Sequence, residues 1–471
     1  MGVSRGKELA KNTAIISVGK ICTQLVSFLL MPLYTMILTT EDYGVVDLVI
    51  TYKQLLLPVV TLQLEQALFR FLVESRKDRQ VTCDVISEIT ALSLTFVLGF
   101  SVFYLGIGLF VQFEFKYYLL LNLWACALSQ MMLQIARGLG HTMVYAAGSF
   151  ILAASQLVLN VFFVAAVRLG AKGMLISMML ANLICAEYIV LKLDVFQYLQ
   201  FRRITKSSIQ KYLKYSAPLV PNSISWWILS ASDRSIILAF LGVSFNGIYS
   251  AAHKFSGIYT ILYNIFNLSW TESIALHMKD EDSSEVFNSL QSAVIRLCVT
   301  VALGIIACMP FVFRLLVNEK FGKAYGQIPI LIIGAFLSSL SGIIGAYYVA
   351  DKKTGFVAKT SSLCAFLNIV VNLCLIRKTG LYAASISTVV AYFVLFLIRY
   401  IVAKRSYGFH LEKSLMSSGI LIASILVFTY YLRNYYICAL ALLLYMIYAV
   451  LINRRLLVNI YGEMKGKIAA K

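Results

Sequence analysis

Long apolar stretches recur along the whole chain, and each is long enough to cross a membrane as a helix. Fourteen such stretches can be recognised in the 471-residue sequence, and the hydrocarbon core of a bilayer, about 30 Å thick, needs a helix of about 20 residues. The chain is 60% apolar and 13% charged, whereas soluble domains are about 45–50% apolar and about 25% charged. The stretches do not alternate apolar and polar residues as barrel strands do. The sequence therefore predicts an all-α polytopic membrane protein with 14 transmembrane helices.

The distribution of basic residues predicts how these helices are oriented. The expected limits of the spans are 13–38, 45–69, 84–111, 117–136, 143–167, 173–195, 216–241, 246–270, 287–313, 326–350, 355–376, 381–403, 414–432 and 435–452. Most of the 41 Lys and Arg residues lie at alternate connecting segments, starting with the N-terminal one. Because cytoplasmic segments carry the excess of Lys and Arg, we expect both termini to be cytoplasmic.

The connecting segments are too short to hold a catalytic domain. No GxxxxGK[ST] phosphate loop is present, which excludes a pump with its own nucleotide-binding domain. The nine Cys show no CxxC spacing and the four His form no ligand pair, so we expect no metal or other cofactor. In a soluble protein, the net charge of +19 would suggest binding to nucleic acid. Here the basic residues lie mainly between the apolar stretches, where they set the orientation of the helices in the membrane. We therefore expect neither an enzyme nor a nucleic-acid partner.

Two weak internal repeats predict the domain organisation. LTTEDYGVVDL aligns with LGVSFNGIYSA, which places Gly44 on Gly247, and NVFFVAAVRLGAKG aligns with NLCLIRKTGLYAAS, from Asn160 and Asn372. Two such copies in the same orientation predict two parallel six-helix lobes around a central cavity. The predicted parts are an N-terminal lobe at 1–195, a basic cytoplasmic linker at 196–215, a second lobe at 216–413, and helices 13 and 14 with a basic tail at 414–471.

Polar residues form stripes on the first two spans of each predicted lobe. On span 2 the stripe is spaced 4, 3, 4, 3 and 4, which puts it on one helix face, and it comprises Asp47, Thr51, Gln54, Pro58, Thr61 and Glu65. Span 1 carries a stripe that includes Lys20, span 7 one that ends at Arg234, and span 8 one with Lys254 at its margin. An ionised side chain at the centre of a membrane helix costs roughly 2.5–3.5 kcal/mol or more, so these faces are expected to meet water or other helices.

Two interpretations of the stripes remain open. Ser, Thr and Asn on membrane helices commonly serve helix–helix packing, and charges near helix ends can reach the interface. The alternative is a cavity with basic groups that bind an anionic substrate, for which the candidates are Lys20, Arg234, Lys53 and Lys254. The acidic residues Asp47, Glu65 and Asp233 are candidates for coupling transport to a proton or sodium ion.

Several segments resemble the polysaccharide-biosynthesis (O-antigen-type) flippases of the multidrug/oligosaccharidyl-lipid/polysaccharide exporter superfamily. The resemblance lies in Lys11 and Asn12, in the PLYT segment from Pro32, in the DYG segment from Asp42, and in YSAPLVPNSISWWILSASDRSIILAFLG with Asp233 and Arg234. It extends over the whole chain. It implies that the protein moves an undecaprenyl-diphosphate-linked oligosaccharide across the bacterial cytoplasmic (inner) membrane, by two lobes that alternate access to a cationic lumen.

This function implies a place in surface polysaccharide assembly, such as O-antigen or capsule. The partners implied are the lipid-linked oligosaccharide, membrane lipid, a polysaccharide polymerase and a chain-length regulator. Two other functions stay open. A cation-coupled multidrug exporter of the same superfamily would need a lumen dominated by acids, and a membrane polysaccharide polymerase or glycosyltransferase would need a large outer loop or an acidic site.

Overall fold

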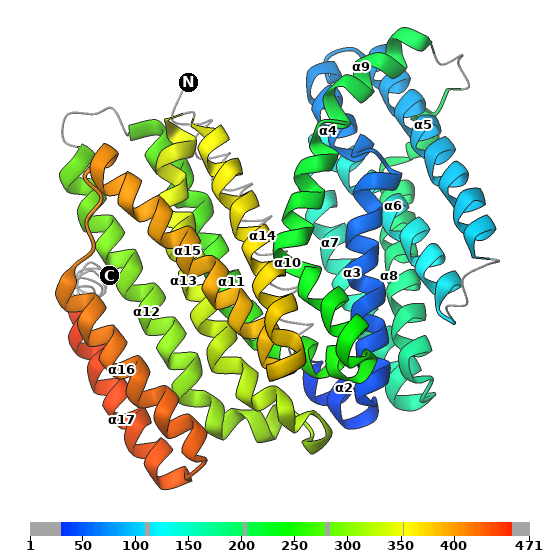
Figure 1. Ribbon diagram of the computed structural model, residues 1–471. Helices are drawn as coiled ribbons and strands as arrows, with labels where there is room; N and C mark the ends of the chain where they lie inside the picture. The colour runs from blue at the N-terminus through cyan, green and yellow to red at the C-terminus, as the bar shows by residue number, and fades with distance from the viewer. Residues whose placement is uncertain (1–29, 109–113, 201–204, 278–282, 352, 455–471) are drawn as a thin grey trace, which may run out of the picture. The chain divides into compact units, whose positions relative to one another are not determined.

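The chain divides into two compact helical units, which are described separately here. The structure is a computed structural model that describes residues 30–108, 114–200, 205–277, 283–351 and 353–454. Unit 1 comprises Met1–Ser235 and unit 2 comprises Ile236–Lys471. All regular structure in these described ranges is helical (Figure 1). The lobe limits expected from the sequence stay predictions.

Unit 1 contains the helices of the first half of the chain. They are α2 (Met31–Ile37), α3 (Thr40–Val60), α4 (Leu64–Ser75), α5 (Arg79–Ile107), α6 (Lys116–Gly138), α7 (Thr142–Asn160), the π-helical η1 (Val161–Ala166), α8 (Gly170–Leu193), the 3-10 turn η2 (Val195–Tyr198), α9 (Lys206–Ser216) and α10 (Leu219–Leu241), which continues into unit 2. Buried apolar side chains of α4, α5, α6 and α8 form one core, which Tyr212 of α9 completes.

Unit 2 is built around α13, which packs against α11, α12, α14 and α15. Its elements are α11 (Val243–His277), α12 (Ser283–Leu316), the 3-10 segment η3 (Glu319–Gln327), α13 (Ile328–Ala350), α14 (Thr354–Thr379), α15 (Tyr382–Tyr407), α16 (Lys413–Leu432) and α17 (Tyr435–Ile452). The last two helices pack against each other and against α12. They therefore flank the unit (Figure 1).

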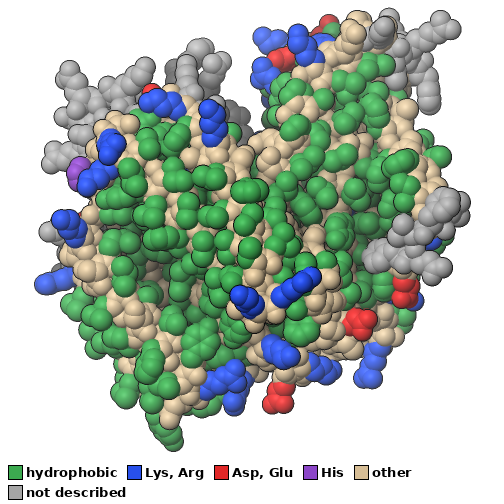
Figure 2. All heavy atoms as spheres, in the orientation of Figure 1, with side chains coloured by type: hydrophobic (Ala, Val, Ile, Leu, Met, Phe, Trp, Pro, Cys, Tyr) green, Lys and Arg blue, Asp and Glu red, His purple; other side chains and the backbone are tan. Residues whose placement is uncertain are grey.

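The helices match the character expected of membrane spans. In the described ranges, 11 helices are long and apolar enough to cross a membrane, or 12 if one bent pair forms a single span. Large apolar side chains also remain exposed on the helices, and hydrophobic groups cover the middle of the face shown in Figure 2. A multi-pass membrane protein is therefore confirmed. The count of 14 stays a prediction, and most of the first expected span lies outside the described residues.

Span 2 was expected to be one helix, and this expectation is wrong. The helix stops at Val60 and α4 begins at Leu64. Between them Leu62 and Gln63 have φ values of +49° and +57°, a left-handed conformation that is unfavourable for residues with a Cβ atom. Pro58, which cannot donate a backbone hydrogen bond, lies one turn earlier. The polar stripe therefore does not continue on one helix face, and Glu65 belongs to a different helix from Asp47.

The start of α3 is fixed by a capping box that joins two helices. The backbone N–H of Asp42 donates to Thr39 Oγ1 (3.0 Å), and the N–H of Thr39 donates to Asp42 Oδ2 (3.2 Å). The other carboxylate oxygen of Asp42 accepts from the N–H of Ala171 (3.2 Å) in the first turn of α8. Gly170 has φ +59°, and a Cβ atom there would lie 3.1 Å from Asp42. The acidic residue of the DYG segment therefore has a structural role.

The two sequence repeats coincide with corresponding helix starts. Thr40 and Val243 begin α3 and α11, with the same offset that separates Gly44 from Gly247. Gly170 and Tyr382 begin α8 and α15, with the offset that separates Asn160 from Asn372. Both asparagine side chains are fully buried. Each repeat therefore coincides with a helix start in both units, and the arrangement as two matching lobes stays a prediction.

Candidate functional site

Two of the predicted polar faces meet within unit 1. Arg234 on α10 donates from Nε to Asp47 Oδ2 on α3 at 2.8 Å, and a second nitrogen donates to the carbonyl of Ser230 (3.1 Å). The side chains of the ion pair are only 11% and 13% exposed. Two residues 187 positions apart in sequence are thus brought together as a nearly buried pair.

Further hydrogen bonds dock α10 along α3. The indole N–H of Trp227 donates to the carbonyl of Thr51 (2.8 Å), and the Tyr52 hydroxyl lies 3.4 Å from Ser235 Oγ. At the break after α3, the amide of Gln63 donates to Ser223 Oγ (3.0 Å). The stripes of spans 2 and 7 therefore face each other, and part of their polarity is used for helix packing.

Lys53 has a different environment on the same helix. Its side chain is 8% exposed. Among the residues that the structure describes, no carboxylate lies within ion-pair distance of its ammonium group and no acceptor hydrogen-bonds to it. Burying an unpaired cation is costly, so this position is unusual for a purely structural residue. The arrangement leaves a positive charge available for an anionic ligand.

Glu65 is the acidic counterpart of this arrangement. Its side chain is 5% exposed in the first turn of α4, directly after the helix break. Within the described ranges, Oε2 is buried and has no hydrogen-bond partner. A carboxyl group with an unsatisfied buried oxygen is suited to carry a proton, because protonation removes the charge that is costly to bury.

For the remaining predicted site residues the structure gives only their position and exposure, or does not describe them. Asp233 is 7% exposed on α10, next to Arg234, and Lys254 is half-buried on α11 in unit 2. Both take part in interactions with other groups. Lys20 lies outside the described residues. The structure thus brings Arg234 and Asp47 into contact within unit 1.

Sequence reasoning missed a buried cation in unit 2. Arg399 on α15, which was not among the predicted site residues, is 5% exposed. Its guanidinium donates to the hydroxyls of Thr360 (3.2 Å) and Ser361 (2.9 Å) on α14, and to the carbonyls of Ser341 (3.0 Å) and Val357 (3.3 Å). The sequence signal was its position inside an apolar run, eighteen residues after the run begins at Leu381. The charge ties α13, α14 and α15 together.

No metal centre is found in the part of the chain that the structure describes, where no three His, Cys, Asp or Glu residues are arranged to hold an ion. The charged groups of this site in unit 1 are the ion pair of Asp47 and Arg234, the ammonium group of Lys53 and the carboxyl group of Glu65. Such groups can bind and release charged ligands without making or breaking covalent bonds.

Comparison with known proteins gives a family match and two distantly related sequences. Residues 9–271 match the family model described as polysaccharide biosynthesis protein. The chain is 22% identical over 415 residues to an uncharacterised membrane protein of Methanocaldococcus jannaschii, which covers 83% of this chain and 96% of that protein. It is 26% identical over 192 residues, 40% of each protein, to the probable low-salt glycan biosynthesis flippase Agl15 of Haloferax volcanii.

Solved structures with a similar fold are transporters. An inward-closed structure of the lipid II flippase MurJ has a TM-score of 0.66 and 13% identity, covering 95% of this chain and 100% of that one. An inward-facing multidrug-resistance transporter of the MATE family, in the MOP superfamily, has a TM-score of 0.67 and 12% identity, covering 81% and 94%. At these identities the similarity establishes the fold alone.

Proposed function

Because the chain belongs to the polysaccharide biosynthesis protein family, we propose that it is a flippase for a lipid-linked oligosaccharide. In this proposal it moves an undecaprenyl-diphosphate-linked repeat unit from the cytoplasmic to the outer leaflet of the bacterial inner membrane, for assembly of surface polysaccharide. The flippase named among its relatives and the flippase fold among its structural neighbours support a flippase function. The protein acts as a transporter and not as an enzyme.

The observation that carries the proposal is the solitary ammonium group of Lys53. The diphosphate is the part of the substrate that a bilayer excludes, and a buried cation compensates its charge inside the membrane. A transporter for cationic drugs would gain nothing from an unpaired lysine in this place. Lys53 is therefore the first residue assigned to the diphosphate, and Lys20 and Lys254 are further candidates from the sequence.

Arg234 contributes in a different way, because its guanidinium already has a carboxylate partner. An arriving diphosphate competes with Asp47 for the same N–H donors, and its two negative phosphoryl groups match the forked geometry of arginine. Exchange of Asp47 for the substrate would free a carboxylate to bind a proton or sodium ion. Asp47 is therefore the first candidate for coupling, followed by Glu65 and Asp233.

An apolar groove in unit 2 supports a lipid substrate. It has a volume of about 970 Å³ and is formed by α12, α13, α15 and α16, with lining residues such as Phe336, Phe393 and Phe428. A polyprenyl tail has no reason to leave an apolar environment, so a surface groove of this kind can hold it while the head moves. The membrane potential also favours outward movement of two negative charges, by roughly 2.3 kcal/mol per charge for 100 mV.

The experiment is a flipping assay with purified protein in phosphatidylcholine vesicles. A fluorescent undecaprenyl-diphosphate oligosaccharide is included, and the fraction reached by a membrane-impermeant quencher is followed over time. With wild-type protein we expect the quencher to reach the labelled lipid of both leaflets. We expect Lys53→Met to lower the rate of lipid flipping more than about tenfold. Lys359→Met is the matched control, because Lys359 is an exposed lysine on another membrane helix, α14.

Other outcomes decide between the remaining functions. Equal flipping by Lys53→Met and wild type would remove the proposed diphosphate site. Transport of a cationic dye by the same vesicles, without movement of the lipid, would favour the multidrug exporter to which the MATE-type fold is related. Release of free lipid diphosphate with growth of the sugar chain would favour a polymerase.

A further inference from the structure

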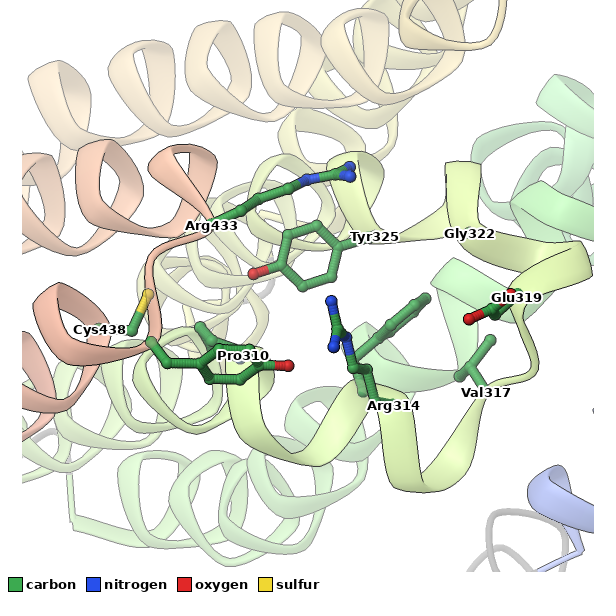
Figure 3. Close-up of a pocket in the computed structure, with 10 residues that line it drawn as sticks. Pro310, Arg314, Val317, Glu319, Gly322, Tyr325, Arg433 and Cys438 are labelled. Carbon is green, nitrogen blue, oxygen red and sulfur yellow. The ribbon is translucent and has the colours of Figure 1, made fainter.

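A second basic site lies in unit 2, far along the sequence from Asp47 and Lys53. A cavity of about 430 Å³ opens between the end of α12, the segment η3 and the turn that joins α16 to α17. Figure 3 shows Arg314, Glu319, Tyr325 and Arg433 in its wall, with Arg433 above and Arg314 below the Tyr325 ring in this view. In the predicted topology this is the outer side of the membrane.

The two guanidinium groups are held by aromatic rings and not by carboxylates. Arg314 lies over the ring of Tyr435 and Arg433 over the ring of Tyr325, each with its central carbon 5.2 Å from the ring centre. Within the described ranges neither forms an ion pair. A ring attracts the charge but accepts no strong N–H hydrogen bond, so the donors of both arginines remain available to a ligand.

The floor of the cavity is rigid. Tyr325 and Tyr430 donate their hydroxyls to each other's backbone carbonyls, at 3.3 and 2.7 Å, and their rings stack with centres 4.0 Å apart. The ring of Phe313 packs edge-on against the ring of Tyr325, with the ring centres 5.1 Å apart. The Tyr431 hydroxyl also donates to the carbonyl of Gly326 (2.6 Å). The ring beneath Arg433 is therefore fixed before any ligand arrives.

Arg433 is held in an unfavourable backbone conformation. It follows the last residue of α16 with φ +54°, a left-handed position that glycine adopts at the ends of many helices. A side chain at such a position costs free energy of order 1 kcal/mol. The arginine at this position lies over the Tyr325 ring, so glycine would keep the backbone conformation and remove the guanidinium group.

We propose that this cavity binds the phosphate of a glycerophospholipid headgroup. Arginine donors match phosphate oxygens, and Glu319 in the same wall can accept hydrogen bonds from headgroup hydroxyls. The helices that line the cavity also carry apolar surface suited to acyl chains, because Leu315, Tyr436 and Leu440 are 74%, 85% and 67% exposed. Aromatic residues at this level are also typical of the membrane interface. Phosphatidylglycerol, with one phosphate and two hydroxyls, fits these groups.

The test measures the melting temperature of the purified full-length protein in detergent micelles while lipid is added. We expect phosphatidylglycerol to raise the melting temperature of wild type in a saturable way. Arg433→Gly should raise the half-saturating concentration about tenfold or more, without lowering the melting temperature of the lipid-free protein, because glycine suits φ +54°. Arg314→Gln should weaken binding similarly. Arg377→Gln is the matched control, because Arg377 is an exposed arginine that also lies over an aromatic ring, Phe240, outside the cavity.

Three results would overturn the proposal. The first is equal phosphatidylglycerol affinity in wild type, Arg433→Gly and Arg314→Gln. The second is an equal shift with diacylglycerol of the same acyl chains, which would show that the phosphate is not recognised. The third is an equal effect of inorganic phosphate at the same concentration, which would make the ligand a water-soluble phosphate and not a lipid.

Discussion

The buried cations of the two units differ in their hydrogen-bond partners. Arg399 in unit 2 donates to two hydroxyls and two carbonyls, so its charge is dispersed among neutral acceptors. In unit 1, Arg234 has a carboxylate partner, and Lys53 has no acceptor among the described residues. Arg399 therefore joins helices, whereas Arg234 and Lys53 can take an anionic ligand as a partner. Only cations of the second kind can take part in transport of an anionic substrate.

The largest effect on stability is expected from Arg399→Leu. Four acceptors on α13 and α14 lose a donor, and buried acceptors without partners destabilise a protein. We expect the free energy of unfolding to fall by about 3 kcal/mol, measured as the melting temperature in detergent. Arg405→Leu on the same helix, where the side chain is exposed, should have little effect. Equal effects of the two changes would contradict the structural role of Arg399.

A smaller effect is expected from Asp47→Asn, which removes the carboxylate charge that pairs with Arg234. Because the pair is partly exposed, we expect a loss of about 2 kcal/mol, below the range for fully buried pairs. Glu41→Gln, an exposed acid in the first turn of α3, is the control. If Asp47→Asn is as stable as this control, the pair is not what holds α10 against α3.

Thr39→Ala tests the capping box and should lower the free energy of unfolding by about 1 kcal/mol. Asp42→Ala should cost more, because it also removes the hydrogen bond to the N–H of Ala171 on α8. Thermal unfolding of the two single variants and the double variant measures their coupling. Additive effects would show that the reciprocal bonds do not act as a unit.

The smallest effect on stability is expected from Lys53→Met, within about 0.5 kcal/mol of wild type or slightly stabilising, because the change removes an unpaired buried charge. The same variant is expected to lose transport. Loss of transport without loss of stability would show that Lys53 serves the substrate, whereas Arg399 serves the fold. A loss of stability as large as that of Arg399→Leu would instead make Lys53 a structural cation.

The positions of most helices could be predicted from the sequence because apolar length alone sets them. The break of span 2 could not, since Leu62 and Gln63 adopt left-handed backbone conformations without the glycine that normally signals one. The stripe on span 2 correctly indicated a face that meets other helices, but the partner of Asp47 lies 187 residues away and is set by tertiary packing. The role of Arg399 was missed because two of its four acceptors are backbone carbonyls, which cannot be recognised from the residue types in the sequence.

The interruption between α3 and α4 also has a mechanical consequence. A continuous helix transmits rotation about its axis along its whole length, whereas two helices joined by left-handed residues can turn independently. The carboxyl groups of Asp47 and Glu65, which one straight helix would have aligned, are therefore governed by different neighbours. Gain or loss of a proton on α4 need not disturb the guanidinium held by α3, so the two events can follow one another in time.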